Sequence, residues 1–278
     1  MADQTFAWYV YCVVPAAQVP PLDDLAAVDP GFPLESVTAR GLSAVTSRVR
    51  VADFGEDALR RNLEDLAWVE RTARAHDAVL TRTLAADAVV PLRLCTIFAD
   101  ADHVRAMLER EHERLHDVLG RLRGRTEWSV KAHADPRRLE RPAPEPGVAG
   151  AAPEQTPGRA FFARKQTDRE LRERAASLAT AAAQDIHDDL RAQAVEALLL
   201  APQDPALSGR TDTMLLNGAY LVERDREPAF EAAVARLAAR HGESGIEVDV
   251  SGPWAPYNFV ATDEDRDERR ATAPARSA

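Results

Sequence analysis

The sequence has few of the features that mark secreted, membrane-spanning or nucleic-acid-binding proteins. It contains only two cysteines in 278 residues, Cys12 and Cys95. Each lies inside an apolar run, which is typical of buried free thiols in a reducing compartment, although a disulfide between them stays open. No apolar run is long enough to span a bilayer, and the first residues lack the basic stretch of a secretory signal. We therefore expect a cytoplasmic protein with no membrane partner.

Positive charge is also in deficit. The chain has 35 Lys and Arg against 45 Asp and Glu, which gives a formal net charge of −10. Binding to phosphate requires a basic face, so this balance argues against nucleic acid and against anionic membrane surfaces as partners. The hydrophobic content of 45% is ordinary for a globular protein. The acidity is most simply explained as a source of solubility.

The signatures of common catalytic and cofactor sites are missing. The chain contains no G-x-G-x-x-G, no P-loop and no G-x-S-x-G. Five of its histidines are scattered without a spacing that favours joint ligation: His76, His103, His133, His187 and His241. We therefore expect no catalytic residues, no cofactor and no enzymatic activity.

One metal-binding motif is nevertheless present. His112-Glu113-Arg114-Leu115-His116 matches H-E-x-x-H on a predicted helix, where two histidines one turn apart can bind zinc while the glutamate activates water. Both histidines flank the apolar stripe of the helix, however, and Glu113 lies opposite that stripe. No third ligand follows at the expected spacing, and the neighbouring residues form a dense charged face. A solvated helix is the preferred interpretation, with a zinc-dependent hydrolase using His112, Glu113 and His116 as the alternative.

Hydrophobic periodicity predicts an α+β protein. Strands are expected over residues 6–14, 36–40, 42–51, 89–94, 126–133, 213–222 and 245–250, and helices over 59–84, 102–122, 159–201 and 227–241. In the second half the order strand, helix, strand, helix, strand suggests a ferredoxin-like plan with an enlarged first helix. We expect each half to lay its helices against one face of its sheet.

Composition sets the predicted domain boundaries. An N-terminal α+β domain is expected over residues 1–123 and a C-terminal modified ferredoxin-like domain over 124–262. Residues 136–158 are rich in proline and glycine, which predicts an exposed loop. Residues 263–278 form a charged tail that is predicted to be disordered.

An unusual stretch lies between Ser251 and Val260. It contains Pro253 and Pro256 together with Trp254 and Tyr257. Proline has no N–H to donate and fixes its own φ, so no central strand can run straight through both prolines. We predict a stiff bend that closes the end of a sheet, with the two aromatic side chains sealing a core.

Arg93 interrupts another apolar run. If Leu92 and Leu94 face the core, Arg93 points to the opposite side of the strand. An ion pair at the surface or between domains is expected there, and contact with an anionic ligand is the alternative.

Five segments of the chain resemble the motifs of a known family, and they occur in the family's order. They are Trp8–Val14, Trp68–Leu80, Pro91–Phe98 (PLRLCTIF against P-L-R-F-G-T-V-F), Glu127–Lys131 (EWSVK against E-W-G-V-K), and Asn217–Val222 followed by Gly252–Phe259 (GPWAPYNF against G-P-W-P-P-Y-S-F). The chain thus resembles the gas vesicle accessory proteins of the GvpF/GvpL family. The departures from the motifs leave the F-type and the L-type both open.

The resemblance implies a non-enzymatic gas vesicle assembly protein with the two-domain fold expected above. Its implied partners are the hydrophobic shell protein GvpA, whose aggregation it would prevent before nucleation, and other gas vesicle accessory proteins. Whether it stays in the mature vesicle is open. The implied structural motif residues are Pro91, Arg93, Trp128, Tyr220, Trp254, Pro256 and Tyr257. A ferredoxin-like sensor of a small ligand is a further alternative.

Overall fold

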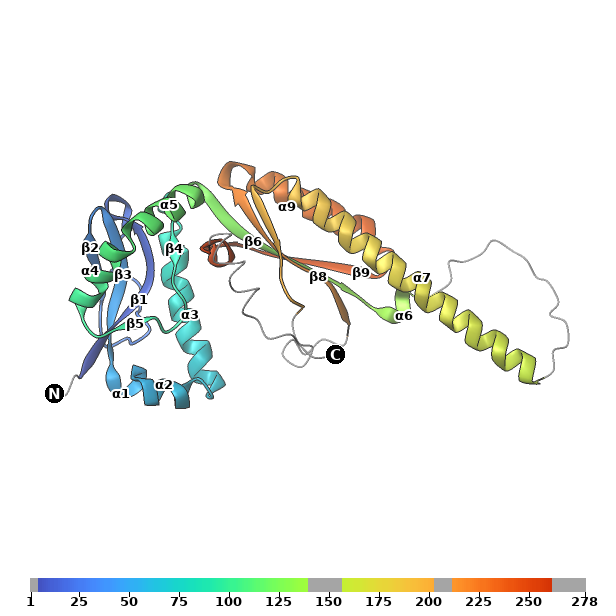
Figure 1. Ribbon diagram of the computed structural model, residues 1–278, viewed down its shortest axis with the longest axis horizontal. Helices are drawn as coiled ribbons and strands as arrows, with labels where there is room; N and C mark the ends of the chain where they lie inside the picture. Colours follow the sequence, from blue (N-terminus) through green and yellow to red (C-terminus); the bar gives the residue numbers. More distant parts are fainter. Residues whose placement is uncertain (1–4, 140–156, 203–211, 262–278) are drawn as a thin grey trace. The chain divides into compact units, whose positions relative to one another are not determined.

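The computed structural model describes residues 5–139, 157–202 and 212–261, and these fall into two compact units (Figure 1). Unit 1 contains the described residues up to Glu127 and from Pro253 onward, and unit 2 contains those from Trp128 to Gly252. The first boundary lies close to the expected one at residues 123 and 124. Residues 253–261 were expected in the C-terminal domain, but their contacts place them in unit 1. The predicted tail at 263–278 lies outside the described residues.

Unit 1 is built on an antiparallel sheet with the strand order β2-β3-β1-β4, in which β5 also pairs with β1. The strands are β1 (Phe6–Pro15), β2 (Leu34–Ala39), β3 (Leu42–Arg50), β4 (Val90–Pro91) and β5 (Ile97–Phe98). The side chains of β1 from Tyr9 to Val14 are all fully buried. A strand with no exposed face needs cover on both sides of the sheet.

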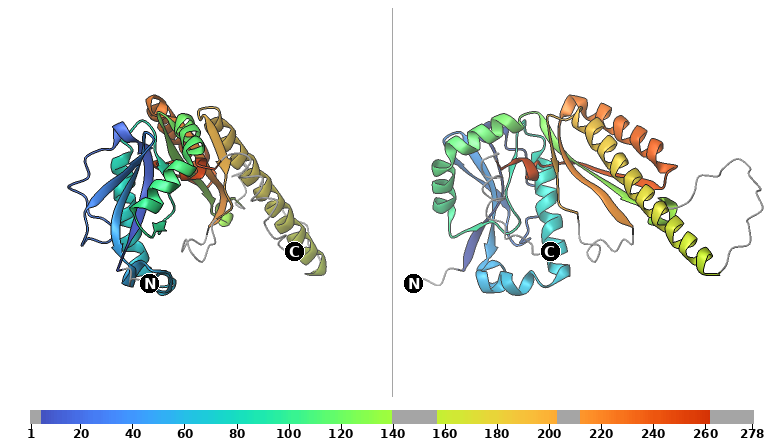
Figure 2. Two further views of the ribbon diagram at one scale, coloured as in Figure 1. Left: turned by 60° about the vertical axis from the view of Figure 1, so that its left-hand side comes forward. Right: turned by 45° about the vertical axis from the view of Figure 1, so that its right-hand side comes forward.

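Helices provide this cover. They are α1 (Val51–Phe54), α2 (Glu56–Asn62), α3 (Leu66–Thr83), α4 (Ala101–Arg110) and α5 (His112–Leu122), with short 3-10 helices η1 (Ala16–Gln18) and η3 (Tyr257–Phe259). α3 lies on one face of the sheet, and α4 and α5 lie on the other (Figure 2). The expectation of helices on one face only is therefore wrong for unit 1, because its apolar strands bury both faces.

Two turns in unit 1 require a left-handed backbone. Arg40 and Gly41, which join β2 to β3, have φ values of 48° and 79°. Two successive positive φ values are typical of a type I′ hairpin turn, and the predicted connection at Gly41 is confirmed. Cys95 has a φ of 61°, and it lies between β4 and β5. The strand expected over 89–94 is therefore reduced to β4, and a second short strand, β5, follows the turn.

Both long helices predicted in the first half are interrupted. The helix expected over 59–84 is divided between α2 and α3, and Asp65 caps α3 by accepting a hydrogen bond from the Ala67 N–H. The helix expected over 102–122 is divided between α4 and α5 at Glu111. The apolar period continues across these breaks, so periodicity alone did not reveal them.

Unit 2 contains a four-stranded sheet with the order β7-β8-β6-β9. Its elements are β6 (Arg125–Ala134, which begins in unit 1), α6 (Pro136–Leu139), α7 (Pro157–Arg191), β7 (Glu196–Leu199), β8 (Thr213–Glu223), η2 (Arg224–Arg226), α9 (Glu227–Gly242) and β9 (Ile246–Trp254, which ends in unit 1). The chain order β-α-β-β-α-β with this strand order confirms the ferredoxin-like plan. α7 and α9 lie along one face of the sheet (Figure 1).

Three expectations for unit 2 change. Residues 196–199 were expected in a helix but form β7, because their backbone pairs with Gly218–Leu221 of β8 and this pairing outweighs local helix propensity. Residues 136–139, expected in the loop, form α6. β9 continues through Pro253 to Trp254, which is allowed because β9 is an edge strand and proline removes no internal ladder bond there.

Among the described residues, no helix has both the length and the apolar character needed to cross a bilayer.

Candidate functional site

Most of the family-like segments meet in unit 1 around a buried histidine. His76 of α3 bonds through Nδ1 to the Tyr9 hydroxyl at 2.8 Å and through Nε2 to the Tyr257 hydroxyl at 2.7 Å. The Cys95 backbone N–H donates to the Tyr9 hydroxyl at 3.1 Å. Four segments that are far apart in the sequence are therefore joined by one chain of hydrogen bonds, which we call the His76 network.

The His76 ring is neutral at physiological pH. Burial lowers its pKa from 6.5 to about 4, against a smaller opposing effect of the Leu92 backbone. A neutral imidazole has one donor and one acceptor nitrogen, and a tyrosine hydroxyl can satisfy either. Burial also raises the pKa of the Tyr9 and Tyr257 hydroxyls, so both remain protonated. The network is thus uncharged and fully bonded at its histidine.

Tyr11 supports the ring from one side. Its ring stacks on His76 with centroids 5.5 Å apart and lies 4.8 Å from that of Tyr9. The Tyr11 hydroxyl bonds to Ser47 Oγ at 2.9 Å and accepts the Val28 N–H at 3.0 Å. These contacts fix the ring orientations that the His76 network requires.

A buried carboxylate holds the residue after Tyr257. Glu127 Oε2 accepts the Asn258 backbone N–H at 2.9 Å, and Oε1 accepts the Asn258 side-chain amide at 2.5 Å. Burial raises the pKa of Glu127, while the two bonds from Asn258 act in the opposite direction. The glutamate of the EWSVK segment therefore anchors the Asn258 of the GPWAPYNF segment.

The predicted bend is present, but its aromatic residues are not the ones that seal the core. Ala255, Pro256 and Phe259 are buried. Trp254 is 38% exposed and Tyr257 is 40% exposed, so the expectation that both seal a core is wrong for their rings. The segment is held by its backbone, by Phe259 and by the Tyr257 hydroxyl, which reaches inward to His76.

The Pro91–Phe98 segment buries one of its motif residues and exposes the other. Pro91 is buried in β4 opposite Cys12. Arg93 is exposed, but it lies in the turn after β4 and not in the expected strand, and its carbonyl accepts hydrogen bonds from the Thr96 N–H and hydroxyl. Over the part of the chain that the structure describes, the Arg93 side chain forms no ion pair. The expected ion pair is therefore not observed there.

The remaining motif aromatics belong to the core of unit 2. Trp128 and Tyr220 are buried, and their rings lie 5.9 and 5.6 Å from that of Phe230. A Cβ on Gly218 would lie 2.7 Å from the Tyr220 ring, so this position leaves room for the tyrosine. The Tyr220 hydroxyl bonds to His187 Nδ1 at 3.1 Å. Trp128 and Tyr220 therefore pack in the core of unit 2.

The H-E-x-x-H segment is not assembled as a metal site. The His112 and His116 rings stack with centroids 6.2 Å apart, and His112 Nε2 bonds to the Arg40 carbonyl at 3.1 Å. His116 and Glu113 are exposed. Throughout residues 5–139, 157–202 and 212–261, no three His, Cys, Asp or Glu side chains gather as metal ligands. No third ligand therefore completes the zinc alternative in the described chain.

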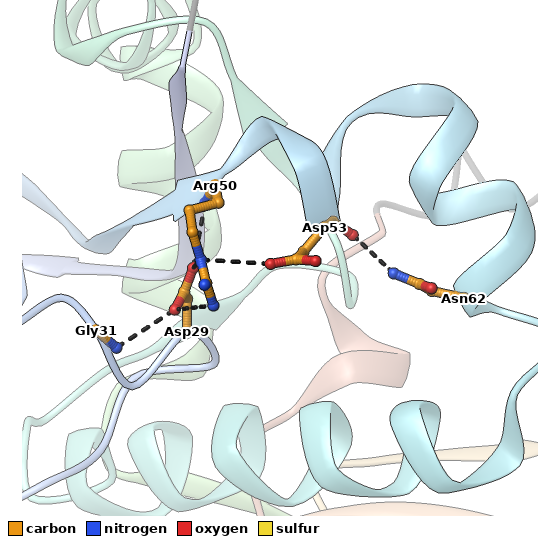
Figure 3. Close-up of polar contacts among 5 residues, drawn as sticks. All are labelled: Asp29, Gly31, Arg50, Asp53 and Asn62. Carbon is orange, nitrogen blue, oxygen red and sulfur yellow. Dashed lines mark hydrogen bonds and ion pairs between the residues drawn. The ribbon is translucent and has the colours of Figure 1, made fainter.

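A second polar cluster in unit 1 is centred on Asp29 and Arg50 (Figure 3). The buried Asp29 carboxylate accepts bonds from the Arg50 N–H, Nε and guanidinium NH2 groups and from the Gly31 N–H. Burial alone would raise the pKa of Asp29, but these donors outweigh it and hold the pKa below its usual value. Arg50 also lies 3.3 Å from Asp53. The cluster fastens the loop before β2 to the end of β3.

The described clusters thus position backbone and rings, and they do not pair a nucleophile with a base. Sequence reasoning treated His76 as an isolated histidine and gave no role to Tyr9, Glu127 or Asn258. The sequence did offer one indication of their importance, because all four residues lie within the family-like segments. What the sequence did not reveal was that these segments meet.

Sequence comparisons match most of this chain to known proteins. The profile of the family described as gas vesicle synthesis protein GvpL/GvpF matches residues 7–261. Gas vesicle protein L of Streptomyces sp. (strain CB03234) is 38% identical over 224 residues, which cover 81% of this chain and 82% of that protein. Gas vesicle protein F of the same strain is 32% identical over 200 residues, covering 71% and 80%.

Solved structures support the fold. The crystal structure of the gas vesicle protein GvpF from Anabaena sp. PCC7120 aligns with a TM-score of 0.64 at 19% identity, covering 93% of this chain and 98% of that one. At this identity the likeness concerns the fold, and the family rests on the sequence matches. The chain belongs to the GvpL/GvpF family of gas vesicle proteins.

Proposed function

We propose that this chain is a gas vesicle assembly factor that binds the hydrophobic shell protein GvpA in the cytoplasm and prevents its aggregation before vesicle nucleation. The observation that carries the proposal is the family match over residues 7–261. A subunit with an apolar face aggregates unless a partner covers it, and a soluble chain of net charge −10 suits that task. The role is non-catalytic, and other gas vesicle proteins are additional partners.

The L-type is the favoured paralogue. Identity to protein L of the Streptomyces strain exceeds identity to protein F of the same strain, at 38% against 32%, and the aligned share of the chain is also larger.

The proposal is tested by diluting purified GvpA from denaturant and following light scattering with and without the purified chain. We expect equimolar chain to suppress most of the scattering and to co-purify with GvpA. An equal mass of serum albumin serves as the control for a crowding effect. Unchanged scattering together with no co-purification would refute the binding role.

A further inference from the structure

The sheet of unit 2 has two edges, and they differ in how they are protected. β9 is one edge and β7 is the other. β9 carries Glu247 and Asp249, both exposed, and ends with Pro253. Charged side chains and proline are the features by which edge strands avoid pairing with another chain. The β9 edge is therefore protected by its own sequence.

The β7 edge is protected only by its short length and by Glu196. After Glu196 it consists of Ala197, Leu198 and Leu199, with no charge and no proline. Leu199 is 60% exposed, and Val195 just before the strand is 44% exposed. Within the described residues, β7 pairs only with β8, through Gly218–Leu221, and its outer side has no neighbouring strand. An apolar edge without proline is a site where another chain can add a strand.

A groove of about 350 Å³ lies beside this edge, between α7 and the first half of β8. Its apolar wall includes Leu199, Leu200, Met214 and Leu215. The volume is at the small end of the range for binding pockets, roughly 300–1,000 Å³, so it suits a few side chains of a larger partner. Residues 213–216 of β8 extend past the last β7 pair, which prolongs the groove along the strand direction.

The charged lining of the groove is acidic. Asp188 and His187 of α7 border it. Burial lowers the pKa of His187, so this ring adds no positive charge at neutral pH. Asp188 is exposed and takes part in none of the ion pairs formed within the described chain. A basic side chain on the occupant would complement it.

We infer that β7 and this groove bind an extended apolar segment of the shell protein that carries a basic residue. The segment adds a strand to the outer side of β7, and its alternate side chains enter the groove beneath α7. Main-chain bonds give affinity, while the groove and Asp188 select an apolar segment with one cation. This inference rests on the proposed function and assigns it a surface.

The test uses variants of the full-length chain in the light-scattering assay. For each variant, the measured quantity is the concentration of chain that halves GvpA aggregation. Leu199→Glu places a charge at the edge without disturbing buried residues, and we expect it to raise that concentration at least tenfold. Val250→Glu is the matched control, because Val250 is 42% exposed on the protected edge β9 of the same sheet. It should behave like the wild type. Asp188→Asn should weaken suppression about two- to fivefold, with the difference vanishing in high salt.

The outcomes separate this surface from the proposed function. If the wild type suppresses aggregation and Leu199→Glu does so equally well, the β7 surface is refuted while the assembly role stands. If the wild type fails, the assembly role itself is refuted and the inference falls with it. Equal losses in Leu199→Glu and Val250→Glu would also overturn the inference, because the effect would then follow added charge anywhere on the sheet.

A second copy of this chain is the competing occupant. Sedimentation velocity of the wild type and of Leu199→Glu distinguishes this occupant from the shell protein. If the substitution converts a dimer to a monomer and leaves suppression of GvpA unchanged, β7 is an interface between copies and the inference is wrong. A wild type that stays monomeric while Leu199→Glu loses suppression supports it.

Discussion

Each unit bonds one histidine to a tyrosine of its core, but the two pairs have different surroundings. In unit 1, His76 is buried between Tyr9 and Tyr257 and joins segments from both ends of the chain. In unit 2, His187 is half-buried and bonds to Tyr220 alone. Both units have an apolar core, but unit 1 adds a buried polar network that joins distant segments, whereas in the described part of unit 2 the outer side of β7 has no neighbouring strand.

The largest expected effect contrasts the two motif tryptophans. Trp128→Ala removes a buried ring from the core of unit 2 and should lower the free energy of unfolding by about 3–5 kcal/mol. Trp254→Ala removes a partly exposed ring and should cost about 1 kcal/mol or less. Urea unfolding followed by far-UV circular dichroism measures both. Equal losses would mean that Trp254 is part of a core after all.

If Trp254→Ala retains its stability, it also becomes an informative variant for binding. A loss of GvpA suppression in a stable Trp254→Ala protein would then report a lost contact with the partner. It would not report lost folding.

The second prediction concerns the pH dependence of the two histidines. Because His76 has a folded pKa of about 4 and an unfolded pKa of 6.5, the unfolded chain takes up a proton between these values. Its contribution to stability is therefore complete above pH 6.5 and is lost as the pH falls toward 4. The full loss is about 3 kcal/mol.

Unfolding free energies at pH 7 and pH 5 measure this slope. His76→Gln should reduce the pH dependence of the unfolding free energy. His187→Gln should reduce it less, because His187 is only half-buried. Glu127 affects the pH dependence in the opposite direction. Because its pKa is raised in the folded chain, its contribution to the free energy of unfolding decreases as the pH rises. An unchanged slope in His76→Gln would contradict a buried neutral ring.

The smallest expected effect lies in the turn that supplies the Cys95 N–H to the His76 network. A non-glycine residue in the left-handed region is strained by about 1–2 kcal/mol, and the family motif has glycine at this position. Cys95→Gly relieves the strain but makes the unfolded chain more flexible, so the net gain should be about 0.5–1 kcal/mol. Cys95→Ala is the control, because it removes the thiol and keeps the strain. Thermal unfolding measures the stability of both variants. Equal stability of Cys95→Gly and Cys95→Ala would contradict the presence of strain at this position.

Much of the fold could be predicted from local pattern. Apolar period and proline placement indicated α9, most of α3 and the strands β1, β3, β6 and β8, and the motif order indicated the family. The errors fall where tertiary contacts override local preference. Glu196-Ala-Leu-Leu199 favours a helix by composition, yet it pairs with β8 because the edge of the sheet offers backbone partners.

The site was less predictable than the fold. His76 lies 67 residues from Tyr9 and 181 from Tyr257, so no spacing rule connects them. Trp254 was expected to be buried because it is large and apolar. The position of the chain at the sheet edge leaves it partly exposed.

By itself, the sequence determined the composition of the core, the acidic surface charge and the membership of the GvpL/GvpF family, because these depend on residue identity and order. Tertiary structure alone decided which side chains meet. It buried His76 as a neutral ring between two tyrosines, turned Glu127 toward Asn258, and, among the described residues, left the outer side of β7 without a neighbouring strand. These outcomes depend on burial and on backbone pairing between distant segments, which no local pattern contains.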